Sequence, residues 1–284
     1  VTTRLGENHY IMTTTTGGAA NVLGKLEDYL QTEWPELDVY LTSVTDHYAT
    51  ASLCGPNSKK ILKKIIPDLD LSDENFPHMS FKESKIGNIQ CRIMRISFTG
   101  EHSYEINVQA SYGKDLWEKC IEAGKEFNIT PYGTETMHLL RAEKGFIIVG
   151  QDTDGTMTPI DLQMDWIVSK KKYDFIGKRS LYRSDTMRED RKQLVGLLTD
   201  DPNIVLEEGA QIVSELNQSP VEMLGHVTSS YFSPNLKKSI ALAVVRGGKD
   251  MVGKKLFVPM ENKNINVTVA NPVFYDEKNE RLNA

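Results

Sequence analysis

One carboxylate, that of Glu105, lies in a strand-like segment where burying a charged side chain would cost free energy. Glu105 lies inside the strand-like run "SYEINV", residues 103–108. Side chains alternate between the two faces of a strand, so Tyr104 and Ile106 share one face while Glu105 and Asn107 share the other. A polar second face meets either water or a ligand, and these residues alone leave both readings open.

Two further charged side chains occupy unusual positions. Arg141 ends a predicted helix just before the apolar run "GFIIVG", residues 145–150, and Asp46 lies at the junction in "LTSVTDHYATAS", residues 41–52. The pattern allows a binding role for Arg141, a solvent-facing charge, or a salt bridge to Glu143 or Asp161.

Most standard catalytic signatures are missing. The six histidines show no H-x-x-x-H spacing and no C-x-x-C occurs, so we expect no zinc or other metal site. Residues 248–255 read G-x-x-x-x-G-K-K; the last Lys replaces the Ser or Thr of a phosphate loop, and the segment lies between predicted strands, which predicts a hairpin turn. No G-x-G-x-x-G or G-x-S-x-G occurs, which disfavours dinucleotide binding and serine hydrolase chemistry within this chain.

Composition is that of an ordinary folded protein. The 284 residues are 39% hydrophobic and 25% charged, with a net charge of -6 that favours neither nucleic acid nor anionic lipid as a partner. Three widely spaced cysteines predict no disulfide framework and a reducing compartment. No apolar run reaches the roughly 20 residues that span a bilayer. These features predict a cytoplasmic protein.

The elements that must position Glu105 and Asp46 alternate between strand and helix signals. We predict strands in residues 8–15, 38–44, 48–55, 91–98 and 103–108, and helices over 17–34 and around Leu116 and Cys120. A further helix is predicted with Pro56 in its first turn, and a loop rich in acids and proline between that helix and residue 91. Arg141 falls on a predicted helix with Thr134 as a possible N-cap and Gly145 as its stop. This order indicates sheets mixed with covering helices.

The pattern changes after the charged run 188–193, which we take as the linker. Short strands separated by turn residues follow, as in a small β-barrel or sandwich, in residues 194–198, 210–213, 224–230, 239–245, 255–260 and 265–270. We therefore predict an α+β protein with a first domain over residues 1–190 and a C-terminal β-barrel domain over residues 191–284.

Several motifs resemble the glycine cleavage T-protein, or aminomethyltransferase, family. "FTGEHSYEI" resembles that family's Y-T-G-E-x-x-[YV]-E-I strand, and "LLRAEKGF" its L-R-L-E-A-G helix. "DFIGKRSL" resembles the F-I-G-K-x-x-L segment, and "GHVTSSYFSPNLKKSIALAVV" a C-terminal motif of the family. These motifs run in the right order from residue 97 to 245.

A closer resemblance runs from residue 1 to the end. "TTTTGGAANVL" and "TETMHLLRAEKGFIIVGQDTDGTMTP" are similar to the C-terminal tetrahydrofolate region of heterotetrameric sarcosine oxidase alpha subunits. The chain opens without Met, so we expect it to be an N-terminally truncated piece of a longer subunit. Flavin and NAD are then expected only in the absent parts, and the other subunits (beta, gamma and delta) as partners.

The resemblance also implies a function. Tetrahydrofolate would capture the one-carbon unit of the imine formed from sarcosine, giving methylene-tetrahydrofolate and glycine. Glu105 matches the pterin-binding acid of the family, Arg141 an arginine that helps to hold the folate, with Glu143 orienting it, and Asp46 a catalytic aspartate. The alternatives are a T-protein-like aminomethyltransferase and a folate-binding module without its own chemistry.

Overall fold

The computed structural model describes residues 1–217 and 219–283 of the chain, which form two compact units. The first contains Val1–Ser97, Glu101–Pro131 and the C-terminal residues from Arg281, and the second contains Phe98–Gly100 and Tyr132–Glu280. The domain boundary predicted between residues 190 and 191 stays a prediction, because the second unit contains both the barrel and the segment from Tyr132 onward.

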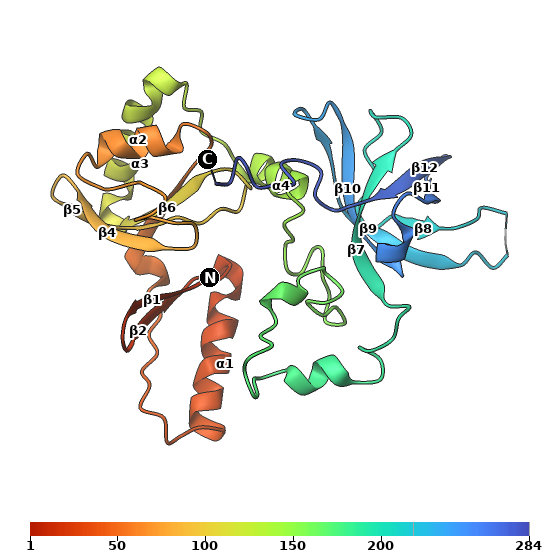
Figure 1. The fold of residues 1–284 in the computed structure, drawn as a ribbon, viewed down its shortest axis with the longest axis horizontal. Helices are drawn as coiled ribbons and strands as arrows, with labels where there is room; N and C mark the ends of the chain where they lie inside the picture. Colours follow the sequence, from red (N-terminus) through yellow and green to blue (C-terminus); the bar gives the residue numbers. More distant parts are fainter. Residues whose placement is uncertain (218, 284) are drawn as a thin grey trace. The chain divides into compact units, whose positions relative to one another are not determined.

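The first unit is built on a four-stranded antiparallel sheet in the order β3-β6-β5-β4. Its strands are β3 (Tyr48–Cys54), β4 (Phe81–Ile86), β5 (Ile89–Met94) and β6 (Ser103–Gln109). Helices α2 (Ser58–Ile65) and α3 (Gly113–Gly124) pack on one face (Figure 1). The core under them includes Leu53, Leu62, Ile93, Tyr104 and Ile106, each less than 5% exposed.

The start of the chain forms a hairpin and a helix. Strands β1 (Thr2–Gly6) and β2 (His9–Met12) pair antiparallel, and α1 spans Ala19–Thr32. Helical spacing was predicted for Val22, Leu23, Leu26, Tyr29, Leu30 and Trp34. The first five are half-buried, whereas Trp34 is 38% exposed and lies beyond the end of the helix. The apolar spacing of this segment therefore marks the less exposed side of α1.

Three local predictions for this unit are wrong. Residues 38–44 form no strand, because Val39 and Tyr40 are exposed and the segment has no partner strand. Strand β4 was not predicted, because its sequence "FKESKI" is too charged to stand out. Pro56 lies before the N-cap residue Asn57 of α2 and not in its first turn.

The second unit carries a closed antiparallel barrel in the order β10-β7-β12-β11-β8-β9 (Figure 1, cyan to blue). The strands are β7 (Lys192–Thr199), β8 (Gln211–Val213), β9 (Met223–Ser233), β10 (Lys238–Arg246), β11 (Lys255–Met260) and β12 (Lys263–Ala270). Each of them overlaps a predicted strand, and the glycine-rich segment 248–255 lies between β10 and β11 as expected. The predicted fold class is confirmed.

Helix α4 (Thr134–Glu143) packs against β9 and β10 within this unit. Its N-cap is Gly133, one residue before the predicted Thr134. Gly145 follows the helix with φ +73°, and a Cβ there would meet the Pro272 carbonyl oxygen at 2.7 Å. This close approach and left-handed backbone explain why glycine ends the helix.

Candidate functional site

Glu105 lies on the face of β6 that the alternation predicts. Its neighbours across the sheet are Ser52 on β3 and Met94 on β5. The face is not open solvent: Met94 is 1% exposed, and the Thr3 hydroxyl of the first hairpin donates to its sulfur at 3.9 Å. Glu105 is therefore held on a rigid strand in a partly covered environment.

The carboxylate of Glu105 has no hydrogen bond or ion pair with any side chain in the part of the chain that the structure describes. It is half-buried, and burial raises its pKa above the ordinary value. An unpaired, partly desolvated carboxylate costs free energy that a ligand with N–H groups would offset. This is the behaviour expected of a binding group.

A row of polar side chains crosses the sheet beside Glu105. Thr50, Asn107, Arg92 and Glu83 are consecutive neighbours on the four strands. The Thr50 hydroxyl donates to Asn107 Oδ1 at 2.6 Å, and Arg92 donates to Glu83 Oε1 at 2.8 Å through Nη2. Thr50 thus pairs with Asn107 and Arg92 with Glu83, whereas the Glu105 carboxylate on the same face has no such side-chain partner among the described residues.

Asp46 is exposed and lies in a short 3-10 helix, Thr45–His47, just before β3. Strand β3 begins at Tyr48, opposite Gln109, which is four residues along β6 from Glu105. Four residues along a strand span about 13 Å at 3.3 Å per residue. Among the described residues, no hydrogen bond or ion pair joins Asp46 to Glu105.

Arg141 lies in the other unit and is fully buried. Its guanidinium forms an ion pair with the Asp152 carboxylate, and it also donates to the Phe146 carbonyl at 3.1 Å and to the Ser229 hydroxyl at 2.6 Å. Among the described residues, Arg141 Nε has no partner. A folate tail could reach the two terminal nitrogens only by displacing protein groups.

Asp152 is the centre of this buried cluster. It accepts hydrogen bonds from the Ile148 backbone N–H at 2.8 Å and from the Thr228 and Ser229 hydroxyls at 2.5 and 2.7 Å. Hydrogen bonds to an ionised carboxylate are stronger than those between two neutral groups. The cluster therefore fastens the end of α4 and the following loop to strand β9.

The partners expected for Arg141 were wrong. Glu143 accepts instead from the Ser233 hydroxyl at 2.5 Å and the Asn235 amide at 2.9 Å, and Asp161 pairs with Arg191. Residues two apart on a helix point in different directions, so Glu143 could not orient Arg141. Arg191, in the predicted linker, is 10% exposed and anchored by that pair.

Sequence reasoning missed Asp152 and its hydroxyl partners. Two features of the sequence could have pointed to this cluster: an acid two residues after the apolar run "GFIIVG", and the polar segment "VTSS" within a strand-like run. No group of three or more His, Cys, Asp or Glu suited to a metal occurs in the residues described. No described helix is long and apolar enough to cross a membrane.

Two family models match the chain. The GCVT N-terminal domain matches residues 1–172, and the glycine cleavage T-protein C-terminal barrel domain matches residues 192–276. Together they cover both the four-stranded sheet and the barrel.

Curated relatives agree with these matches. The chain is 50% identical over 285 residues to a sarcosine oxidase subunit alpha of Corynebacterium sp. (strain P-1) and 41% identical over 286 residues to that of Rhizobium meliloti (strain 1021). Each alignment covers 99% of this chain but 29% of the relative. An aminomethyltransferase of Thermoanaerobacter sp. (strain X514) is 32% identical, over 84% of this chain and 62% of its own length.

A solved structure shares the fold. The glycine cleavage system aminomethyltransferase T from Bartonella henselae superposes with a TM-score of 0.81 at 22% identity, over 97% of this chain and 71% of that one. With a family model matched over more than half of its residues, the chain belongs to the glycine cleavage T-protein family of aminomethyltransferases.

Proposed function

We propose that the chain binds tetrahydrofolate and uses it to capture the one-carbon unit of the imine made from sarcosine, as part of a sarcosine oxidase alpha subunit. The observation that supports folate binding best is the half-buried Glu105 carboxylate, which has no partner among the described residues. The relatives named sarcosine oxidase subunit alpha, alignable over 99% of this chain, support the choice of reaction.

Glu105 suits the edge of a pterin. A pterin presents a ring N–H beside an amino group, and one carboxylate can accept from both in a bidentate pair. The ligand would thereby favour the charged form of Glu105, against the burial that now raises its pKa. Its place on a central strand keeps the carboxylate aimed in one direction.

Tetrahydrofolate would supply the two nitrogens that take up the carbon. The imine loses its carbon–nitrogen bond, its nitrogen leaves as glycine, and the two protons of the folate nitrogens end on that amine. The exchange balances without an oxidant. We assign the preceding oxidation of sarcosine to a flavin outside this chain, with the beta, gamma and delta subunits as partners.

Arg141 and Asp46 enter the proposal differently. We propose that Arg141 supports the folate site through the loop that follows α4, since its guanidinium is bound to Asp152 and Ser229. A proton-steering role for Asp46 rests on the resemblance alone. It predicts that Asp46→Asn slows methylene transfer and leaves folate affinity unchanged.

Two other functions compete. A T-protein-like aminomethyltransferase is supported by the 32% identical relative of that name, and would accept the carbon from a carrier-bound aminomethyl group instead of an imine. A folate-binding module would bind the ligand and turn over neither donor. Assays with each donor, in the presence of a sarcosine-oxidising flavoprotein, separate the three. The cytoplasmic location is part of this proposal and is supported by the three widely spaced cysteines, which predict a reducing compartment.

The deciding experiment is calorimetric titration of the 284-residue chain with tetrahydrofolate. Glu105→Gln should weaken binding by roughly 10- to 100-fold, the value of a charge-assisted pair. Glu83→Gln is the matched control, because Glu83 lies on the same face but is exposed and paired with Arg92. Unchanged affinity for tetrahydrofolate in a folded Glu105→Gln variant would contradict the assignment of Glu105 to the folate site. Oxidation of sarcosine by the chain alone would contradict the assignment of that step to a flavin outside this chain.

A further inference from the structure

A long surface segment, residues 163–190, lies between α4 and the first barrel strand, β7 (Figure 1, green). None of its residues is buried, and it contains only two short 3-10 helices, Asp165–Ile167 and Lys178–Tyr182. Connections longer than about 12–15 residues without regular structure are uncommon in compact domains and are usually functional or disordered.

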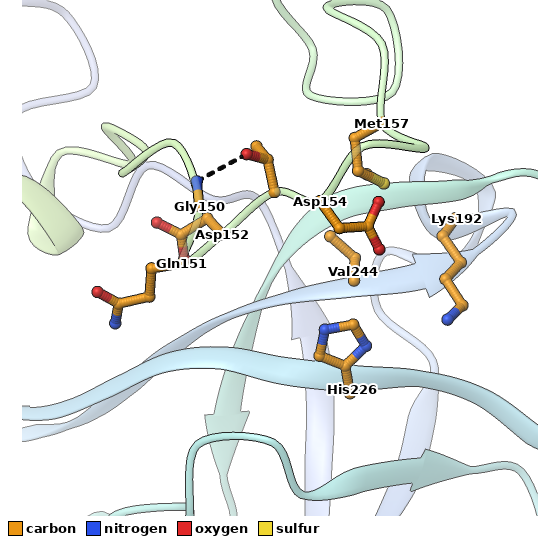
Figure 2. Close-up of a pocket in the computed structure, with 9 residues that line it drawn as sticks. Gly150, Gln151, Asp152, Asp154, Met157, Lys192, His226 and Val244 are labelled. Carbon is orange, nitrogen blue, oxygen red and sulfur yellow. Dashed lines mark hydrogen bonds between the residues drawn. The ribbon is translucent and has the colours of Figure 1, made fainter. Parts of the chain in front are cut away.

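The part of the connection that precedes this segment packs on the barrel. Met157 and Val244 line the same cavity of about 240 Å³ (Figure 2), and Met157 also packs against the buried cluster that contains Leu162 and Leu194. Leu162 is buried, and the uncovered segment begins directly after it. The lack of cover is therefore a property of residues 163–190 and not of the whole connection.

Large apolar side chains are concentrated in this segment. Tyr173 is 96% exposed and Trp166 is 76% exposed. Single exposed apolar residues are normal on a protein surface, whereas a large group of them marks an interaction site. Trp and Tyr are also among the residue types that contribute most to binding energy in interfaces. The exposed large apolar residues of the segment are Trp166, Ile167, Tyr173, Ile176, Tyr182 and Met187.

One side chain, that of Arg191, fixes both ends of the segment. Its guanidinium donates to Asp161 through Nε at 2.9 Å and through Nη2 at 2.7 Å, and to Asp185 through Nη1 at 2.8 Å. Between these ends, the hydrogen bonds that residues 165–184 form in the described part of the chain stay within residues 164–187. The segment is thus held at its base with its apolar side chains uncovered, which lowers the cost of ordering it against a partner.

We propose that residues 163–190 dock onto an apolar surface formed by a part of a longer subunit that this chain does not span. The chain covers 29% of each sarcosine oxidase alpha relative and 71% of the solved aminomethyltransferase, so these proteins carry residues without a counterpart here. Permanent interfaces are the more hydrophobic ones, and another part of the same polypeptide is a permanent partner. The net charge of -6 disfavours an anionic membrane as the occupant. The inference rests on the proposed place of the chain in a longer alpha subunit and not on its folate chemistry.

The test compares the 284-residue chain with the longer subunit from the native gene, by hydroxyl-radical labelling and mass spectrometry. In the 284-residue chain, Trp166 and Tyr173 should be oxidised rapidly. In the longer subunit their rates should fall to the rate of Tyr104, which is already fully buried in this chain. Unchanged rates at Trp166 and Tyr173 would overturn the inference. Folate is absent from both samples, so the outcome is independent of whether Glu105 binds a pterin.

Variants locate the effect in the segment. Ile176→Ser should lower the melting temperature of the longer subunit by about 4 °C or more, but that of the 284-residue chain, in which Ile176 is exposed, by about 1 °C or less. Val252→Ser is the matched control, because it removes an exposed aliphatic side chain from the turn between β10 and β11. An equal loss for both variants in the longer subunit would overturn the inference.

Other occupants have their own signatures. Dimerisation of the 284-residue chain that Ile176→Ser abolishes, measured by analytical ultracentrifugation, would overturn the inference in favour of a second copy. Cosedimentation with phosphatidylserine vesicles that the same substitution abolishes would overturn it in favour of a membrane surface. We expect a monomer that does not sediment with the vesicles.

Discussion

The guanidinium of Arg141 and the carboxylate of Asp152 are paired with both side chains completely removed from solvent. Removing two charges from water costs free energy, which their mutual attraction and hydrogen bonds to their other atoms offset. Asp152 accepts such hydrogen bonds from Ile148, Thr228 and Ser229. The pair therefore joins a helix end, a loop and a barrel strand that are far apart in the sequence.

Breaking this pair should destabilise the chain strongly. Asp152→Asn leaves the buried Arg141 charge uncompensated, and we expect a loss of about 3–5 kcal/mol in the free energy of unfolding, measured by urea denaturation. Glu222→Gln removes one partner of the exposed Arg246–Glu222 pair and should cost at most about 1 kcal/mol. Similar losses in both variants would show that Asp152 does not stabilise the helix end as inferred.

The Glu105 carboxylate should lower the free energy of unfolding by an amount that depends on pH. Burial raises its pKa above the ordinary value of 4.5, so the folded chain loses stability as pH rises from 4.5 through the folded pKa, and the deficit persists above it. Glu105→Gln should therefore melt at a higher temperature than the unchanged chain at pH 7 and at the same temperature below pH 4.5. A difference that does not vary with pH would contradict this explanation.

Gly225 should tolerate no side chain. A Cβ at this position would lie 1.9 Å from the carbonyl oxygen of Val244 on the neighbouring strand. Gly225→Ala must push β9 and β10 apart, at a cost of about 3 kcal/mol or more in unfolding free energy. Gly155→Ala is the control, since nothing lies within 4 Å of its added Cβ, and it should change stability by about 0.5 kcal/mol or less.

The three cysteines should differ in reactivity. Burial raises the pKa of Cys91 and of Cys120 to about 11, whereas Cys54 is half-buried. At pH 8 only on the order of one in a thousand of the two buried thiols is ionised, and the thiolate is the reactive form. A colorimetric thiol reagent should label one cysteine in the native chain and three in denaturant. Rapid labelling of all three in the native chain would contradict the burial.

The barrel could be predicted from sequence because each strand carries its own alternation and ends at its own turn residues. The same local signals placed Glu105 on the correct face of β6. Strand β4 escaped prediction because pairing with β5, and not apolar content, makes it a strand. The prediction for residues 38–44 was wrong for the opposite reason: the segment has β-forming residues but no neighbouring strand with which to pair.

The site was harder to predict because its contacts are long-range. Arg141 meets Ser229 across 88 positions, and no spacing rule connects them. The distance between Asp46 and Glu105 depends on the register of β3 against β6, which pairs Ser52 with Glu105. A motif can identify such residues one by one, but only pairing shows which of them meet.

The order β3-β6-β5-β4 also has a consequence for association between molecules. A barrel closes on itself, whereas this sheet stops at two outer strands whose free backbone groups could recruit a strand from another chain. On β4 the residues Lys82, Glu83 and Lys85 place charge along that boundary. Charged side chains on an outer strand oppose such pairing, so the unpredicted and highly charged β4 protects the sheet from aggregation.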